Sequence, residues 1–420
     1  MSAAHRESSS LLASDVASAA ARLRAAQSVA HEPSRAAEVL SRAAALWRDR
    51  NYPRRRDAIG QIARQAGYSV ALLEESLDAL LKPFSHAALS SLAEKASRSR
   101  QADRPQLLGF IMAGNVAGAG LHEIAIGLVA GACMIVKSAS TEPIFFDQFA
   151  RTLAELDREV ASRIAVFNWS REREDLTAAM AGNCDRVIAY GDDATIVSLR
   201  NNGAVIGFGS RVSGAVVVPD AMVPGRIAAV AEALARDVVL FEQLGCLSLH
   251  HIFVVSPSTD GARDFAARIA GTLARVGDSM PPATIPLRDA AEILGVRERA
   301  RWRRIAGESI ELFEGPRLEW TVVCEPESTG DNSFVVSPGF RTVHVTGVRD
   351  EKQLRAIFAV ASGRIEAVAV AGDALETRRI SATLDTLGVS YIAAPGEMQS
   401  PPLLWRHGGG AFLDMMVASR

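Results

Sequence analysis

Cysteine is scarce in this sequence, with four residues in a chain of 420, and no two of them are close enough to form a CxxC pair. This wide spacing excludes a zinc ribbon and provides no disulfide framework, so we expect no metal site. It fits a reducing compartment, and the sequence therefore predicts a cytoplasmic protein. The four are Cys133, Cys184, Cys246 and Cys324.

Long apolar runs are also missing. The longest, residues 124–136, lies between Glu123 and Lys137 and is too short to span a bilayer as a helix. Residues 1–28 are rich in alanine and serine, but charged residues interrupt them, so they lack the continuous apolar core of a secretory signal. The sequence therefore predicts no membrane span.

A large net charge is absent too. The formal net charge is −2, which argues against nucleic acid as the main partner. Apolar residues, in contrast, make up 48% of the chain and can bury large cores. The length of 420 residues favours two domains over one.

The spacing of apolar residues changes along the chain. Between residues 10 and 97 it is helical, and from residue 106 short apolar strands alternate with helices. Alternation of this kind is typical of a doubly wound, mostly parallel α/β sheet. We expect the strands of this first series at residues 107–112, 134–136, 164–167, 187–190, 205–208 and 215–218. A second α/β layer is expected to follow, with strands at residues 252–255, 321–324, 342–345, 367–371 and 391–393.

Cys246 lies on a predicted tight turn in front of an apolar run of β type. The small Gly245 beside it leaves the thiol accessible. A thiolate in this place can attack a carbonyl carbon and hold an acyl group as a thioester. The alternative is a buried cysteine that packs as a small apolar side chain.

A glycine-rich turn, residues 113–120, connects the first strand with the helix after it. Its glycines, Gly114, Gly118 and Gly120, do not fit the GxGxxG spacing of a dinucleotide loop. Asn115 is the more informative residue, because an amide on a rigid turn can donate to a developing oxyanion, which lowers the barrier by about 3 kcal/mol. The alternative is an asparagine that stabilises its own turn.

Several residues near strand ends are candidates for cofactor binding, because ligands of parallel sheets bind outside the carboxyl ends of strands. Lys137, with Ser138 and Ser140 after it, could hold a ribose or a phosphate; the alternative is a solvated strand end. The turn at Gly191 could face a pyrophosphate, although two aspartates follow it. Arg211 could meet a phosphate, or equally a carboxylate from the edge of the sheet.

Taken together, these segments resemble the acyl-CoA reductase family of the bacterial luminescence fatty-acid reductase subunit, which belongs to the aldehyde dehydrogenase superfamily. The resemblance extends from about residue 60 to the end of the chain, and its specificity comes from the order and spacing of the motifs. The motifs are Gly114-Asn115-Val116, Val136-Lys137-Ser138 with Glu142-Pro143, Arg211-Val212-Ser213, Gln243 with Cys246-Leu247-Ser248, and Pro401-Pro402-Leu403 with Trp405-Arg406-His407.

The resemblance implies an aldehyde-dehydrogenase-like α/β fold with a Rossmann-type cofactor domain, an α/β catalytic domain and a helical N-terminal segment. The expected bounds are a helical segment at 1–100 that packs on the cofactor domain, the cofactor-binding domain at 101–236, and the catalytic domain with the nucleophilic cysteine at 237–395. A tail at 396–420 is expected to return to the cofactor domain or to a subunit interface, in a homo-oligomer.

The resemblance also implies roles for single residues. Cys246 is similar to the nucleophile that carries the acyl group, and Asn115 to the oxyanion amide. Lys137 resembles the lysine that holds the adenosine ribose, and Gly191 the glycine turn near the pyrophosphate. Family members use NADPH, and the region of Lys137 to Ser140 leaves room for its 2′-phosphate.

The sequence departs from the oxidising members of the superfamily at one informative point. Residues 207–210, which stand where those enzymes carry the glutamate that activates the hydrolytic water, contain no carboxylate. A reductase must keep water away from its acyl-enzyme, so this absence favours reduction. The histidine that the family often has near Ser210 is missing as well, which leaves Glu242 and His251 as candidates for acid–base catalysis.

The expected reaction is therefore NADPH-dependent reduction of a fatty acyl thioester, from acyl-CoA or an acyl carrier protein, to a long-chain aldehyde through an acyl-Cys246 thioester intermediate. Acyltransferase and synthetase proteins are expected partners. Three alternatives stay open: an NAD(P)-dependent aldehyde dehydrogenase that oxidises, a non-catalytic scaffold subunit, and a Rossmann dehydrogenase with no covalent step.

Overall fold

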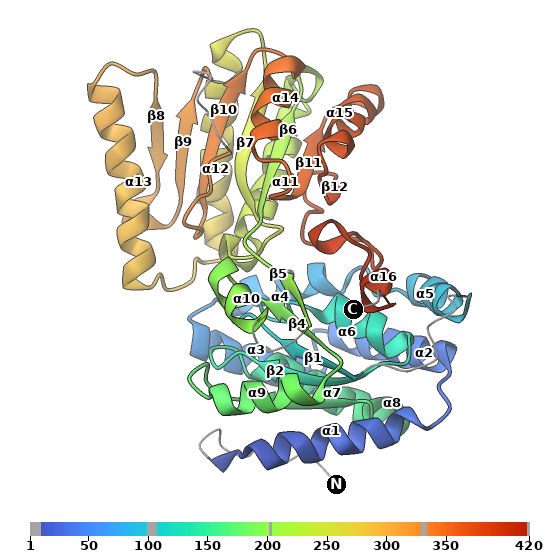
Figure 1. Cartoon of the computed structure of the whole chain (residues 1–420). Coiled ribbons are helices and arrows are strands. Elements are labelled where there is room, and N and C mark those ends of the chain that lie inside the picture. The colour runs from blue at the N-terminus through green and yellow to red at the C-terminus, as the bar shows by residue number, and fades with distance from the viewer. Residues whose placement is uncertain (1–9, 99–106, 201–203, 329–333, 418–420) are drawn as a thin grey trace. The chain divides into compact units, whose positions relative to one another are not determined.

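The computed structural model describes residues 10–98, 107–200, 204–328 and 334–417. The chain forms two compact units, coloured by residue number in Figure 1. The first unit comprises Met1–Ala66, Leu80–Ser210 and Pro402–Arg420, and the second comprises Gly67–Ala79 and Arg211–Pro401. The domain bounds expected from the sequence divide the chain by function, into cofactor-binding and catalytic parts. That division stays a prediction.

The first unit contains a five-stranded sheet with the order β3-β2-β1-β4-β5. All four pairings are parallel, and the order reverses between β1 and β4, which makes this point the topological switch of a doubly wound sheet. The strands are β1 (Leu107–Ile111), β2 (Cys133–Ser138), β3 (Ile164–Asn168), β4 (Arg186–Tyr190) and β5 (Val205–Phe208).

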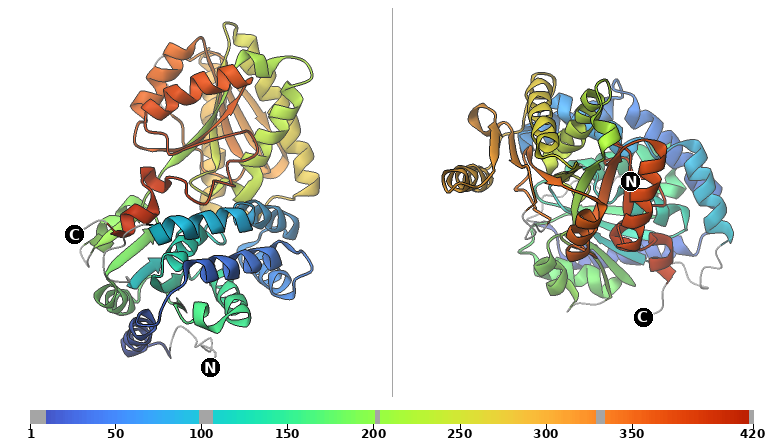
Figure 2. Two further views of the ribbon diagram at one scale, coloured as in Figure 1. Left: turned by 90° about the vertical axis from the view of Figure 1, so that its right-hand side faces the viewer. Right: turned by 90° about the horizontal axis from the view of Figure 1, so that it is seen from above.

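Helices surround this sheet (Figures 1 and 2). Helix α1 packs with α9 over β1 and β2, where Val16 and Leu23 join a buried cluster with Ile135 and Trp169. The helices of the unit are α1 (Ala13–Gln27), α2 (Pro33–Arg48), α3 (Pro53–Ala66), α5 (His86–Arg98), α6 (Leu121–Val129), α7 (Ile144–Leu156), α8 (Arg158–Ala161), α9 (Glu174–Asn183), α10 (Asp193–Arg200) and α16 (Phe412–Val417). Helix α4 (Val70–Leu81) begins in the second unit. The predicted helical N-terminal segment is confirmed.

The second unit contains a seven-stranded sheet with the order β12-β11-β6-β7-β10-β9-β8. Its pairings are parallel except that of β8 with β9. The strands are β6 (Val212–Val217), β7 (Leu249–Val255), β8 (Glu311–Glu314), β9 (Thr321–Glu325), β10 (Thr342–Val348), β11 (Ile365–Ala371) and β12 (Tyr391–Ala393).

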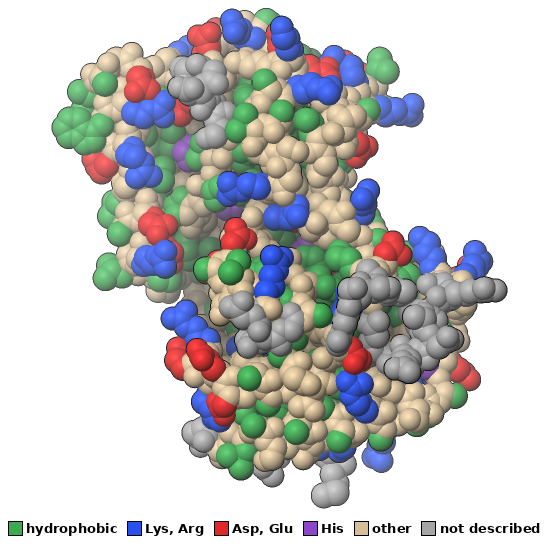
Figure 3. Space-filling model, viewed as in Figure 1, with side chains coloured by type: hydrophobic (Ala, Val, Ile, Leu, Met, Phe, Trp, Pro, Cys, Tyr) green, Lys and Arg blue, Asp and Glu red, His purple; other side chains and the backbone are tan. Residues whose placement is uncertain are grey.

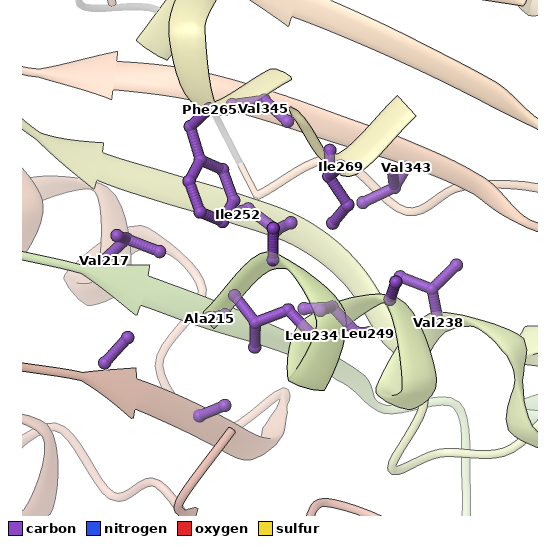
Figure 4. Packing of buried hydrophobic residues seen from close by; sticks show 14 of the residues in the cluster. Ala215, Val217, Leu234, Val238, Leu249, Ile252, Phe265, Ile269, Val343 and Val345 are labelled. Carbon is purple, nitrogen blue, oxygen red and sulfur yellow. The ribbon is translucent and has the colours of Figure 1, made fainter. Parts of the chain in front are cut away.

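Both faces of this second sheet are buried. Ala215 and Val217 of β6 face a core built with α11 (Ile227–Val239) and α12 (Thr259–Ser279), which Figure 4 shows from close by. Val216 faces the opposite core, which contains residues of α14 (Glu351–Val360) and α15 (Ala374–Thr386). Helix α13 (Leu287–Ile305) packs on β8 and β9. Side chains of successive strand residues point to opposite faces, so one apolar run supplies both cores.

Two details differ from the expectation. The strand expected at residues 215–218 is β6, which pairs with β7 and β11 instead of completing the first sheet. An apolar strand buried on both faces does not show in its sequence which sheet it joins. Strand β8 was not predicted, because it is a short edge strand with a glutamate at each end.

Charged side chains of both signs are interspersed on the face drawn in Figure 3, in line with the net charge of −2. Across the described ranges, no helix combines the length and apolarity needed to cross a membrane.

Candidate active site

Three of the four cysteines are poorly suited to form a thiolate. Burial raises the pKa of Cys184 and of Cys324 to about 12, and it raises the pKa of Cys133 as well. These thiols are therefore poor nucleophiles near neutral pH. Cys246 forms no disulfide and is partly exposed, so the alternative of a buried apolar side chain does not describe it. Its catalytic role stays a prediction.

The turn of Cys246 is fixed by hydrogen bonds on both sides. Gly245 N–H donates to Ser248 Oγ at 3.1 Å, and Ser248 N–H returns a bond to the Gly245 carbonyl oxygen at 3.0 Å. The Cys246 carbonyl oxygen accepts from Ser213 Oγ at 2.6 Å, and Ser213 Oγ in turn accepts from Ala367 N–H at 2.9 Å. The turn is thus attached to β6 and β11.

The segment in front of this turn is strained. Phe241, Glu242 and Gln243 have φ angles of 54°, 51° and 63°, in the left-handed region. Phe340 and Arg341 are left-handed too, with φ of 49° and 58°. A left-handed conformation costs a non-glycine residue roughly 1–2 kcal/mol. Such residues persist where the surrounding structure determines them, and they cluster at functional sites.

Glu242, a predicted acid–base residue, lies deep in the second unit. Its carboxylate and the guanidinium of Arg341 are each 1% exposed and lie 2.7 Å apart. Ala283 N–H also donates to this carboxylate at 3.0 Å. Burial raises the pKa of Glu242, and the charge of Arg341 opposes this shift. The acid–base role of Glu242 stays a prediction.

His251, the other acid–base candidate, uses both ring nitrogens inside the protein. Val335 N–H donates to Nδ1 at 3.0 Å, so the proton of the neutral ring is on Nε2, which lies 2.8 Å from Thr346 Oγ1. Burial lowers the pKa of His251 well below its usual value. This geometry offers no ring nitrogen to a substrate.

Asn115 is exposed on the turn between β1 and α6 in the first unit. The turn depends on its glycines. A Cβ on Gly114 would lie 1.9 Å from Thr141 Oγ1, and Gly118 and Gly120 have φ of 79° and 89°. These three positions accept only glycine, and the backbone that they form holds Asn115. Its role as an oxyanion donor stays a prediction.

Two of the predicted cofactor residues lie at the carboxyl edge of the first sheet. Lys137 and Ser138 end β2 and are buried, and Ser138 Oγ is a fully buried hydroxyl without a hydrogen-bond partner. An unsatisfied buried hydroxyl is rare and calls for a ligand or water. Burial lowers the pKa of Lys137, which the charge of Glu172 partly opposes. Asn168 Nδ2 fixes the backbone here by donating to the Ser138 carbonyl oxygen at 3.2 Å.

The other predicted cofactor residues lie at different places. Ser140 is exposed on the loop after β2, and Gly191 directly follows β4 on the far side of the switch point. Arg211, in the second unit, lies with Nε 3.2 Å from a carboxylate oxygen of Glu366 on β11. The sequence left two alternatives for Arg211, a phosphate or a carboxylate of the sheet. The structure shows that a carboxylate, that of Glu366, is one of its partners. Binding of a cofactor by these residues stays a prediction.

Sequence reasoning missed the partners that hold the segment before Cys246. Arg341 pairs with Glu242 across 99 residues of sequence, and Thr342 bonds to the side chain of Gln243 over the same separation. The only local signal is the glycine turn at Gly339, whose φ is 83°.

Residues 34–419 match the family model "Acyl-CoA reductase (LuxC)". A long-chain acyl-protein thioester reductase of Photobacterium phosphoreum is 23% identical over 331 residues, which are 73% of this chain and 64% of that protein. The protein of the same description from Photorhabdus laumondii is 23% identical over 230 residues, 49% of this chain and 47% of its own length. The chain thus covers less than two thirds of the length of these curated relatives.

Solved structures of aldehyde dehydrogenases share the fold. A salicylaldehyde dehydrogenase from Pseudomonas putida G7 has a TM-score of 0.71 at 17% identity, over 96% of this chain and 88% of that one. An aldehyde dehydrogenase from Mycobacterium tuberculosis, solved with NAD+, has a TM-score of 0.68 at 16% identity, over 91% of this chain and 83% of that one. The predicted aldehyde-dehydrogenase-like fold is confirmed.

Proposed function

Because the chain belongs to the acyl-CoA reductase (LuxC) family, we propose that it reduces a fatty acyl thioester to an aldehyde, with NADPH as the reductant and Cys246 as the acyl carrier. The observation that carries this proposal is the contrast among the thiols. Cys246 is partly exposed on a hydrogen-bonded turn. Cys133 and Cys324 are buried, and Cys184, although partly exposed, has a pKa that burial raises to about 12. Acyl transfer needs an accessible sulfur, and Cys246 offers one on this turn.

The chemistry proceeds in two stages. The Cys246 thiolate attacks the thioester carbonyl, the carbon–sulfur bond to the donor breaks, and the donor leaves as a thiol after taking a proton. The Cys246 N–H and the Asn115 amide stabilise the oxyanion formed in between. NADPH, when bound, supplies the hydride for the second stage. The resulting thiohemiacetal on Cys246 then collapses, which releases the aldehyde and restores the thiol.

We assign the cofactor to the carboxyl edge of the first sheet. The unsatisfied hydroxyl of Ser138 supports a ribose or phosphate there, beside Lys137 and Ser140. Glu142, the nearest following acid, instead accepts from Ile144 N–H at 3.0 Å at the start of α7. No acid stands between Lys137 and Glu142, which supports binding of a 2′-phosphate. Gly191 would face the pyrophosphate, and Arg211 is a further candidate for phosphate binding.

The donor of the acyl group is either acyl-CoA or an acyl carrier protein. Acyltransferase and synthetase proteins are the partners that fit this reaction, in a homo-oligomeric enzyme. The free cysteines support a reducing cytoplasm as its location.

The test is NADPH and NADH oxidation with a panel of acyl-CoA chain lengths, for the natural protein and Cys246→Ser. We expect turnover with NADPH that Cys246→Ser abolishes. A fatty aldehyde and NADP, with and without CoA, form the opposing assay. Acid formation that needs no CoA would contradict the reductase and favour an oxidising dehydrogenase.

A further inference from the structure

The two left-handed segments of the second unit contact each other directly. Phe340 N–H donates to the Glu242 carbonyl oxygen at 2.9 Å. The Arg341 guanidinium donates two hydrogen bonds to the Glu242 carboxylate, from Nε at 3.1 Å and from Nη2 at 2.7 Å. Gln243 Nε2 donates to the Thr342 carbonyl oxygen at 2.7 Å, and Thr342 N–H donates to Gln243 Oε1 at 2.8 Å. Each segment therefore holds the other in its strained conformation.

The same side chains also connect to the scaffold around Cys246. Gln243 Nε2 donates to the carbonyl oxygen of Leu249, the first residue of β7, at 2.6 Å. Glu242 Oε1 accepts from Ala283 N–H at 3.0 Å. The carboxylate of Glu242 and the amide of Gln243, four and three residues before Cys246, are thus engaged with protein groups.

Burial makes this contact rigid. Glu242 and Arg341 are each 1% exposed, so water does not compete for their hydrogen bonds. A two-pronged arginine–carboxylate contact fixes orientation as well as distance, which a lysine cannot do. The pair therefore acts as a clamp on the backbone of residues 241–243. Without it, these non-glycine residues would relax out of the left-handed conformation.

We propose that Glu242, Arg341 and Gln243 are positioning residues, which hold residues 241–243 left-handed and thereby set the direction of the Cys246 sulfur for acyl transfer. This inference rests on the function proposed above, because the direction of the Cys246 sulfur matters for acyl transfer only if Cys246 is the nucleophile. It gives Glu242 a role without proton transfer, in contrast to acid–base catalysis.

The experiment measures single-turnover acylation of Cys246 by mass spectrometry, with the best acyl-CoA of the panel at several concentrations. Arg341→Met removes the clamp, and the maximum acylation rate should fall by roughly 100-fold, the effect of a misplacement of about 1 Å. The half-saturating acyl-CoA concentration should stay the same, because the clamp does not bind the donor. The acylation rate of Arg341→Lys should lie between those of the natural protein and Arg341→Met, because lysine keeps the charge but cannot form the bidentate contact.

The decisive variant is Glu242→Gly combined with Arg341→Met. Glycine adopts the left-handed region without strain, so it removes the need for a clamp at this residue. Acylation should then recover by about tenfold over Arg341→Met alone. An acid–base catalyst replaced by glycine cannot recover in this way. The pH profile of the double variant should keep the shape of the natural one.

Arg297→Met is the matched control. This arginine is also buried in the second unit, where it donates to Thr321 Oγ1 at 2.9 Å and to the Trp320 carbonyl oxygen at 2.9 Å. It should lower stability without a comparable loss of acylation rate.

Two outcomes overturn the positioning role: unchanged acylation in Arg341→Met and Arg341→Lys, or a double variant no faster than Arg341→Met. Cys246→Ser separates this failure from that of the proposed function. If Cys246→Ser still turns over, the nucleophile itself is misassigned. If it is inactive while the Arg341 variants are fully active, only the clamp is wrong.

Discussion

Replacement of Glu242 by glutamine should destabilise the second unit strongly. The variant keeps the shape of the side chain but leaves the Arg341 guanidinium, 1% exposed, without its counter-charge. The glutamine NH2 group would also face N–H donors of Arg341 or Ala283, where the carboxylate accepts bonds at 2.7 and 3.0 Å. Breaking a buried pair on one side costs about 3–5 kcal/mol. For a unit of this size, the melting temperature should fall by roughly 10 °C.

The assay is thermal and urea unfolding of the natural protein, Glu242→Gln, and the double variant Glu242→Leu with Arg341→Met. The double variant should recover most of the lost stability, because apolar residues can replace a buried pair at little cost. The difference between the natural protein and Glu242→Gln should persist at high salt, since screening acts weakly on buried charges. A loss below about 1 kcal/mol in Glu242→Gln, the range of exposed pairs, would refute the reasoning.

Three further predictions address other parts of the chain. Asn115→Ala should slow acylation by roughly 100-fold while the alkylation rate of Cys246 stays constant; equal loss in both would point to a folding defect instead. Ser138→Ala should weaken NADPH binding, measured by titration, without lowering stability, because the hydroxyl has no partner in the protein; unchanged binding would exclude it from the cofactor site. Asp237, buried at the end of α11, has a pKa raised by burial to about 8 from 3.8. The folded state therefore keeps a proton that the unfolded state releases, so the stability from Asp237 is complete below pH 3.8 and is lost as pH rises to 8. Urea unfolding should show this decline in the natural protein and a flatter profile in Asp237→Asn, and equal profiles would contradict it.

Much of the fold could be predicted from the sequence, because strands buried on both faces and amphipathic helices have distinct apolar periods. The strand assignment of β6 was wrong, since membership of a sheet depends on distant partners, here β7 and β11. The short edge strand β8 carries too few apolar residues to be recognised.

Within the candidate site, the sequence indicated the residue types but not their contacts. Cys246 could be named from its turn and the strand that follows. The partners of Glu242 and Arg211 could not, because Arg341 and Glu366 lie far away in the sequence. The left-handed backbone at Phe241 could not be predicted either, because glycine is the residue that indicates such a conformation in a sequence.

The most direct test of the account is to mix the protein with an acyl-CoA in the absence of NADPH and to locate the adduct by peptide mass spectrometry. The account predicts one acyl group on the peptide that contains Cys246, lost after addition of NADPH with release of aldehyde. An acyl group on another residue, or no adduct while NADPH-dependent aldehyde formation proceeds, would contradict it.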